Sequence, residues 1–357
     1  MRAGAATRVG SASALVAALS LLSACRSAPP ARVCGTPPMT PVHVDLNVKF
    51  KGWDALALDN GNLRVVVVPA IGRVMGLGFA GDAAGAADPL WIHPAAGKDL
   101  RPDENGWINY GGDKAWPAPQ SEWQRIAGKG WPPPATFDAR PYTATVTQQE
   151  IEMVSAVDPA YGMRVRRKVH LVNDVLMVDT TYEKVEGPSV RVAVWTITQL
   201  ASPERMFAPL PSDASTYASL MPAQPHDLRV DDFHLSLARH TTEKTMIATN
   251  APSLAWIGAG RDLVITNMGT SFDSGGGSAP VARSAPHAGN VNAQIYTSPD
   301  GAEPYVELEL LSPLVDLAPG QRVTMLVRYW LARREKADPD QEARRLFTDP
   351  RGESPRR

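Results

Sequence analysis

The sequence predicts an all-β protein: a large antiparallel β-sandwich with one short helix near its C-terminal end. About fifteen stretches alternate apolar and polar residues with a period of two, which is typical of strands that bury one face. Proline (32 residues) and glycine (28 residues) are frequent in the 357-residue chain and favour turns between short strands. The regular alternation of strand and helix that a parallel doubly wound sheet requires is missing.

The alternating stretches begin at about Val42 and continue to about residue 335. After them, Asp338 and Pro339 form an N-cap and first-turn pair, which predicts the start of a short helix. The predicted strands are 42–48, 54–60, 63–69, 73–81, 89–94, 142–148, 150–157, 163–172, 175–185, 189–200, 226–238, 253–259, 262–268, 293–298, 305–313 and 321–333.

The first 24 residues are predicted to be a targeting segment. A basic start precedes an apolar run, 14–24, that is shorter than the roughly 20 residues needed to span a bilayer. The run ends at Cys25 in "LSAC", which resembles the lipobox of bacterial lipoproteins and implies a lipid on the Cys25 sulfur. Arg26, standing where an aspartate would retain the protein at the inner membrane, implies the periplasmic face of the outer membrane. A plain secretory signal that happens to contain a cysteine is the alternative.

Four segments follow from these boundaries: a signal peptide (1–24), a Pro/Ala-rich tether (25–41), a sandwich (42–335), and a helix with a charged tail (336–357). The second cysteine, Cys34, lies in the tether, so no cysteine remains for a disulfide or a zinc site in the folded body. The composition, 44% hydrophobic with a net charge of −1, is that of an ordinary soluble globular protein. It offers no excess of basic residues for binding nucleic acid.

Motifs for several common chemistries are missing from the sequence. There is no phosphate-binding Walker loop, no G-x-S-x-G turn of serine hydrolases and no G-x-G-x-x-G that opens a helix. The seven histidines have no H-x-x-x-H spacing of the kind that binds zinc. We therefore expect no cofactor and no metal ion.

The stretch "WINYGGDKAWPAPQSEW", residues 107–123, is the most unusual part of the chain. Its prolines exclude a continuous helix and remove donors from a strand ladder, which predicts a structured loop. Indole rings pack on the C–H face of a sugar, and charged neighbours bind its hydroxyl groups. The alternative is that the rings close the open end of the sandwich as a small core. The residues of this stretch predicted to contact a sugar are Trp107, Asn109, Asp113, Lys114, Trp116, Gln120 and Trp123.

A second candidate is the strand "PYVELELLSP". Because strand side chains alternate, Tyr305, Glu307 and Glu309 are expected on one face, with neighbours about 6.6 Å apart. Two carboxylates beside a tyrosine can hold a sugar hydroxyl or provide a general base. An ordinary solvated face is the alternative. The basic row from Arg164 to His170 is interpreted as such a solvated face.

These residues resemble a known group of proteins. "NGNLRVVVVPAIGRVMGLGFAG" is similar to the start of galactose mutarotase-like domains, and the GGDK-W-PAPQ run, "GWPPP" and "YVELELLSPLVDLAPGQ" resemble the domain-of-unknown-function 4380 family. The resemblance covers residues 45–333. It implies a β-supersandwich with a concave surface that faces carbohydrate.

The resemblance also implies roles for single residues. Arg73 matches the early arginine that mutarotases use to contact sugar. Glu307 stands where their late strand carries the catalytic base, and Glu309 replaces the following glutamine. His93 lies near their first histidine, whereas the central strand "VWTITQL" has no histidine, so the resemblance assigns no proton donor.

The sequence therefore predicts an envelope lipoprotein that binds a mono- or oligosaccharide in a cleft walled by the tryptophan-rich stretch. In an enzymatic version, Glu307 is the general base of a mutarotase-like or epimerase-like reaction. The alternative from another class is a structural or assembly lipoprotein that reuses the fold without binding sugar.

Overall fold

The computed structural model describes residues 40–348 except for 83–87, 99, 211–216, 222–224, 226, 240–241, 243, 259–262, 274–282, 285–291, 300 and 302. For 263–273 and 283–284 it describes the backbone alone. The predicted signal peptide, Cys25, nearly all of the tether and the end of the charged tail lie outside the described residues.

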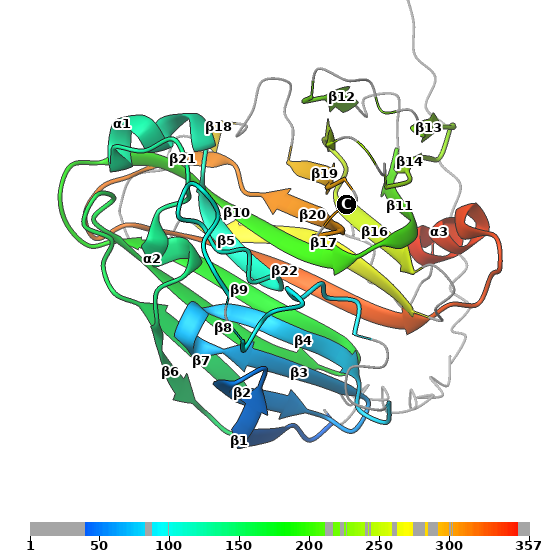
Figure 1. The fold of residues 1–357 in the computed structure, drawn as a ribbon, viewed down its shortest axis with the longest axis horizontal. Helices are drawn as coiled ribbons and strands as arrows, with labels where there is room; N and C mark the ends of the chain where they lie inside the picture. Colours follow the sequence, from blue (N-terminus) through cyan, green and yellow to red (C-terminus); the bar gives the residue numbers. More distant parts are fainter. Residues whose placement is uncertain are drawn as a thin grey trace, which may run out of the picture. The chain divides into compact units, whose positions relative to one another are not determined.

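One sheet of the described chain has twelve strands (Figure 1). Its main path runs β1-β2-β3-β4-β5-β10-β20-β19-β15-β12, and β21 joins it beside β10 and carries β18. The bounds are β1 His43–Phe50, β2 Trp53–Asp59, β3 Leu63–Val68, β4 Arg73–Phe79, β5 Asp113–Ala118, β10 Val190–Ala201, β12 Tyr217–Ser219, β15 Thr245–Thr249, β18 Arg283–Ser284, β19 Ala293–Thr297, β20 Tyr305–Leu311 and β21 Leu314–Leu317.

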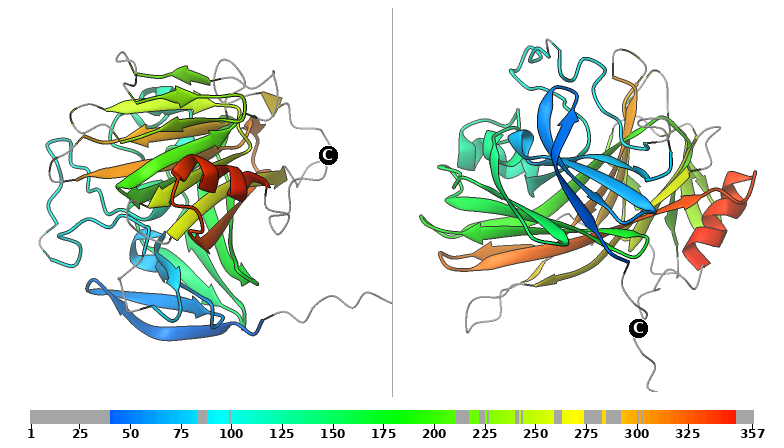
Figure 2. Two further views of the ribbon diagram at one scale, coloured as in Figure 1. Left: turned by 90° about the vertical axis from the view of Figure 1, so that its right-hand side faces the viewer. Right: turned by 90° about the horizontal axis from the view of Figure 1, so that it is seen from below.

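The other sheet has ten strands in the order β13-β14-β11-β16-β17-β22-β9-β8-β7-β6. Figure 2 shows the two sheets stacked as layers. Because every strand pairing given for the described residues is antiparallel, the predicted all-β antiparallel sandwich is confirmed. The bounds are β6 Tyr142–Val146, β7 Glu150–Ser155, β8 Met163–Val172, β9 Val175–Lys184, β11 Pro203–Pro209, β13 Arg229–Val230, β14 His234–Leu237, β16 Ser253–Gly258, β17 Leu263–Asp273 and β22 Arg322–Arg333.

Helices are short and few among the described residues. α3 begins at Pro339, and its Gln341 N–H donates to the Asp338 carboxylate at 2.9 Å, so the predicted cap is confirmed. None of the helices in the described ranges is long and apolar enough to cross a membrane. The remaining helical segments are η1 Pro69–Ile71, η2 Gln120–Glu122, α1 Trp123–Ala127 and α2 Ala135–Asp138.

The prediction that residues 107–123 form a loop throughout is wrong for its middle, because 113–118 form the strand β5. β5 pairs with β10 along its whole length but with β4 only where Val74 meets Asp113. Beyond that point one side of β5 has no ladder partner among the described strands. Pro117 is therefore tolerated, since a missing N–H costs little at such an edge.

Candidate functional site

The register of three neighbouring strands gathers polar and aromatic side chains on one face of the twelve-stranded sheet. Lys114 of β5 lies opposite Ile197 of β10, which lies opposite Glu309 of β20. Residues directly opposite in a ladder share a face, and so do residues two apart along a strand. We call this side of the sheet the polar face. Its members include Lys114, Trp116, Trp195, Gln199, Tyr296, Tyr305, Glu307 and Glu309.

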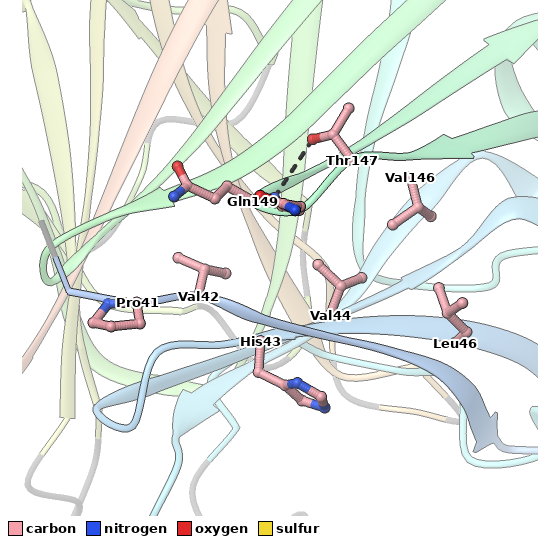
Figure 3. Close-up of a pocket in the computed structure, with 9 residues that line it drawn as sticks. Pro41, Val42, His43, Val44, Leu46, Val146, Thr147 and Gln149 are labelled. Carbon is pink, nitrogen blue, oxygen red and sulfur yellow. Dashed lines mark hydrogen bonds between the residues drawn. The ribbon is translucent and has the colours of Figure 1, made fainter.

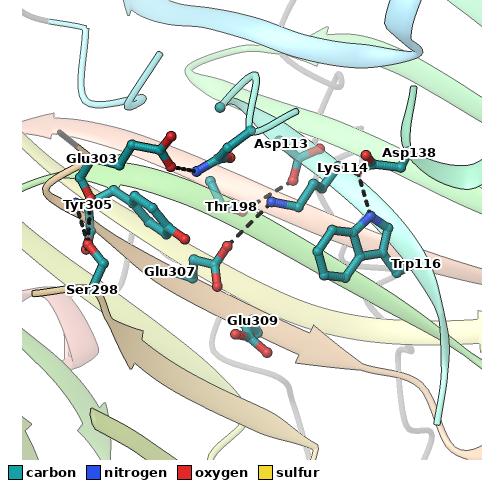
Figure 4. A network of polar contacts seen from close by, with 12 residues as sticks. Asp113, Lys114, Trp116, Asp138, Thr198, Ser298, Glu303, Tyr305, Glu307 and Glu309 are labelled. Atoms are coloured by element: carbon teal, nitrogen blue, oxygen red, sulfur yellow. Dashed lines mark hydrogen bonds and ion pairs between the residues drawn. The ribbon is translucent and has the colours of Figure 1, made fainter. Parts of the chain in front are cut away.

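Lys114 and Glu307 are in direct contact at the centre of the polar face. The Lys114 Nζ donates to Glu307 Oε1 at 3.3 Å, although the two residues are 193 positions apart (Figure 4). Burial lowers the pKa of the Lys114 ammonium, and the negative charge of Glu307 opposes that shift. The ammonium also lies 4.8 Å from the Trp116 ring centroid. Glu307 is 8% exposed, which is more than either Lys114 or Glu309.

Glu309 lies on the same face but is fully buried. Its Oε2 accepts a 2.7 Å hydrogen bond from the Trp195 indole. Burial and the nearby negative charge of Glu307 raise the pKa of Glu309 well above its usual range. Both effects disfavour the charged form of the Glu309 carboxyl.

The raised pKa of Glu309 predicts how stability depends on pH in Glu309→Gln. A carboxyl whose pKa is raised by folding contributes most below its unfolded pKa, and the contribution is lost as pH rises. Above about pH 4.3, the free energy of unfolding should shift in favour of the variant by up to about 1.4 kcal/mol per pH unit. Urea denaturation of the wild type and variant between pH 5 and 8 measures this. For Glu104→Gln, at an exposed site, the free energy of unfolding should change with pH as it does in the wild type. A difference between Glu309→Gln and the wild type that does not vary with pH would contradict the raised pKa of Glu309.

Gln199 is a member of the polar face that the sequence did not reveal. It lies opposite Glu307 in the ladder, is fully buried, and neither its Oε1 nor its Nε2 has a hydrogen-bond partner among the described residues. A buried amide without partners is costly unless water or a ligand completes it. β10 lies between β5, which carries Lys114, and β20, which carries Glu307. This position is what marks Gln199 as a candidate.

The tryptophans form a connected cluster at one end of the polar face. The Trp116 ring makes edge-on contacts with Trp107, Trp123, Trp131 and Trp195, at centroid distances of 5.6 to 6.2 Å. Trp116 is 5% exposed, and Trp107 and Trp131 are half-buried. Much of the ring surface is therefore used for packing, while the outer rings retain some exposure.

Asp138, at the end of α2, fixes this cluster. Its carboxylate accepts hydrogen bonds from the indole of Trp116 at 2.8 Å and the indole of Trp107 at 3.0 Å. It also pairs with the guanidinium of Arg73 at 2.6 Å. Arg73 is fully buried and donates to Gly111 O, so the structure places this predicted sugar contact beneath the cluster as a support. Asp138 was not anticipated, because its partners come from three separate segments.

The remaining predicted contacts are divided between the two sides of the sheet. Asp113 lies on the opposite face of β5 from Lys114, between the sheets, where it pairs with Arg167 and accepts from the Tyr329 hydroxyl. Asp113 also accepts a hydrogen bond from Thr198 (Figure 4). Trp123 is fully buried with its indole bonded to Pro117 O at 2.7 Å. Gln120 is exposed in η2.

Asn109 belongs to a small polar group near the Tyr305 end. Its Nδ2 donates to Glu303 at 2.8 Å, and its Oδ1 is buried without a partner in the described chain. His93 Nε2 lies 3.3 Å from the other oxygen of Glu303. Because His93 Nδ1 accepts the Ala95 N–H, the ring proton sits on Nε2 and points at Glu303.

Two glycines bring this part of the chain close to its neighbours. Gly111 and Gly112 both have positive φ, 89° and 75°. A Cβ on Gly111 would lie 2.2 Å from Trp91 O, and one on Gly112 would lie 2.4 Å from Val74 O. Only glycine permits this close approach, which sets where β5 begins and hence where Lys114 points.

A separate groove of about 660 Å³ lies between β1 and the turn after β6 (Figure 3). Its lining contains no carboxylate and no lysine or arginine, and β1 is four strands from β5 in the sheet order. This groove is not part of the polar face. Among the described residues, no group of three or more His, Cys, Asp or Glu side chains could hold a metal ion.

The fold is that of the galactose mutarotase-like sandwiches. A galactose mutarotase-like protein from Lactobacillus casei is 8% identical with a TM-score of 0.50, the alignment covering 78% of this chain and 99% of that one. The Slr1438 protein from Synechocystis is 13% identical with a TM-score of 0.51, over 80% and 99%. The chain belongs to the family described as domain of unknown function DUF4380, whose model matches residues 54–332. The resemblance predicted from the sequence is thereby confirmed.

A third similar structure is longer than this chain. A TPR-domain containing protein from Parabacteroides distasonis is 12% identical with a TM-score of 0.52, over 78% of this chain but 47% of that one. This chain thus spans about half of that protein. Curated protein sequences give no match. At these identities the likeness establishes the fold, and function has to be argued from the site.

Proposed function

We propose that this protein binds a carbohydrate on the polar face and that Glu307 accepts a proton from it. One observation carries the proposal: Lys114 and Glu307 meet at 3.3 Å beside the unpartnered amide of Gln199. A carboxylate, an ammonium and an amide together supply the acceptors and donors that a sugar's hydroxyl groups require. The neighbouring indoles and tyrosines supply apolar surface for its C–H faces.

The same arrangement supports an epimerase-like proton transfer. The Glu307 carboxylate, which lies against the Lys114 ammonium, can take a proton from a hydroxyl group on an anomeric carbon. The negative charge left on that sugar oxygen is stabilised by the Lys114 ammonium. Lys114 cannot swing away easily, since it is buried against Trp116.

A structural role without sugar is the second candidate, and the tryptophan cluster favours it. Trp116 makes T-shaped contacts with four other indoles, and two of these five rings donate hydrogen bonds to Asp138. Mutual ring contacts and indole hydrogen bonds within the protein are what a cluster that serves packing would have. In that case, Trp116→Ala would lower stability and there would be no affinity for sugar to lose.

Glu307→Gln tests the catalytic proposal. A library of mono- and oligosaccharides is first screened by tryptophan fluorescence, and turnover of any bound sugar is followed by NMR. We expect the variant to stay folded, because glutamine keeps the shape and can still contact Lys114, while turnover falls about 100-fold or more.

Glu104→Gln, at an exposed position, is the matched control and should keep the wild-type rate. Unchanged turnover in Glu307→Gln would eliminate this residue as the base. A wild-type protein that binds sugar without converting it would be a binding module. No fluorescence response to any sugar would favour the structural role.

A further inference from the structure

Resting on the proposed carbohydrate site, the geometry points to a narrower ligand class: we infer that the polar face takes an uncharged linear oligosaccharide rather than a single sugar. Aromatic groups lie at both ends of this face, and the polar groups lie between them. Two features indicate this ligand class: the distance between the two aromatic groups, and the charged side chains near and between them.

The second aromatic group is separate from the tryptophan cluster. Trp91 lies 4.9 Å from Tyr305 between ring centroids, and Tyr305 lies 6.1 Å from Tyr296. Met221 and Met246 pack against these rings. Each of the three rings keeps a small exposed area, between 7% and 9%. A sugar ring can therefore contact this group at its surface.

The register gives the separation of the two groups. Trp195 lies opposite Leu311, and Ala201 lies opposite Tyr305, so the two levels are six residues apart along β10. At about 3.3 Å per residue, this is roughly 20 Å. That length exceeds one pyranose ring and suits a short chain of them.

Hydrogen-bonding groups occupy the interval. Glu307 and Gln199 lie at the same level of the ladder, between the two aromatic groups. Nearer Tyr305, the unpartnered Asn109 Oδ1 accompanies Glu303. Unpartnered buried groups at two separate levels would be completed by hydroxyls of successive rings rather than by one ring.

The charges favour an uncharged ligand. Lys114 is neutralised by Glu307, and Arg73 by Asp138. Arg239, which donates to Ser298 O at 3.0 Å, is already engaged with protein oxygens. The half-exposed carboxylate of Glu303 would repel a uronic acid.

Titration calorimetry with sugars of increasing length tests the inference. The probes are α-1,4- and β-1,4-linked glucose and galactose series from one to six rings, with oligogalacturonides as the charged series. For a neutral series that binds, we expect affinity to rise about tenfold or more between one and four rings, then to level off. Tyr305→Ala should remove that gain and keep single-sugar binding. Tyr217 of β12 is exposed and lies on the side of the sheet opposite the polar face, so Tyr217→Ala should keep the rise in affinity with sugar length.

Equal affinity for one and four rings would overturn the inference and leave the proposed function standing. Tighter binding of the charged series would overturn the uncharged class. No binding in any series would remove the inference together with carbohydrate binding. Because the length series uses the wild type, the test remains decisive even if Tyr305→Ala does not fold.

Discussion

Asp138→Ala is expected to lower the free energy of unfolding by about 3–5 kcal/mol, the range seen when one partner of a buried ion pair is removed. The change leaves the fully buried Arg73 guanidinium without its counter-charge. It also removes the acceptor for the indole N–H groups of Trp107 and Trp116. Because whole domains are stable by only about 5–15 kcal/mol, this is a large fraction of the total.

Urea denaturation followed by tryptophan fluorescence measures the effect. Glu122→Gln is the control: it breaks the exposed pair between Glu122 and Arg125, which should cost about 1 kcal/mol or less. Asp138→Asn, which keeps an acceptor oxygen but no charge, should fall between the two. A cost below 1 kcal/mol for Asp138→Ala would show that Arg73 does not depend on this carboxylate.

Asp113→Ala should lower the free energy of unfolding by a similar amount. Here the ion pair that is lost lies on the other side of the sheet. Asp113 balances Arg167, a buried cation of β8, and accepts hydrogen bonds from Tyr329 and Thr198. Removal of Asp113 leaves the Arg167 charge unpaired between the sheets. This should lower the free energy of unfolding by about 3–5 kcal/mol. Replacing both charged residues, as Asp113→Leu with Arg167→Met, should recover most of the loss, since the double change leaves no unpaired charge.

The double-mutant cycle separates this ion pair from the rest of the core. The single variants Asp113→Leu and Arg167→Met are compared with the double variant by urea denaturation at one pH. Additive losses would show that the two residues do not depend on each other. The folded double variant should also keep any sugar binding of the wild type, because Asp113 faces away from Lys114.

Local pattern explains what the sequence could predict. Period-two alternation identified most of the strands, and it correctly placed Tyr305, Glu307 and Glu309 on one face. The same rule, applied to the adjacent pair Asp113 and Lys114, would have separated them. The prolines of this stretch predict a loop, and strand alternation does not apply to a loop.

Other features depend on contacts between distant segments. Arg167 stands on the apolar face of β8, with Val165 and Val169, inside a strand that is otherwise basic on its outer face. Its partner lies 54 positions away, so composition alone gives no hint of the pair. Asp138 similarly receives its partners from β4, β5 and the segment before β5.

The carboxylate of Asp138 has a consequence for recognition. Two indoles whose nitrogens are tied to one acceptor on another segment cannot rotate independently. A molecule stacking on them would meet rings already held in place, so little side-chain freedom would be lost upon association. These fixed rings would then bind tightly a molecule whose shape matches them. They would adjust little to a molecule whose shape does not.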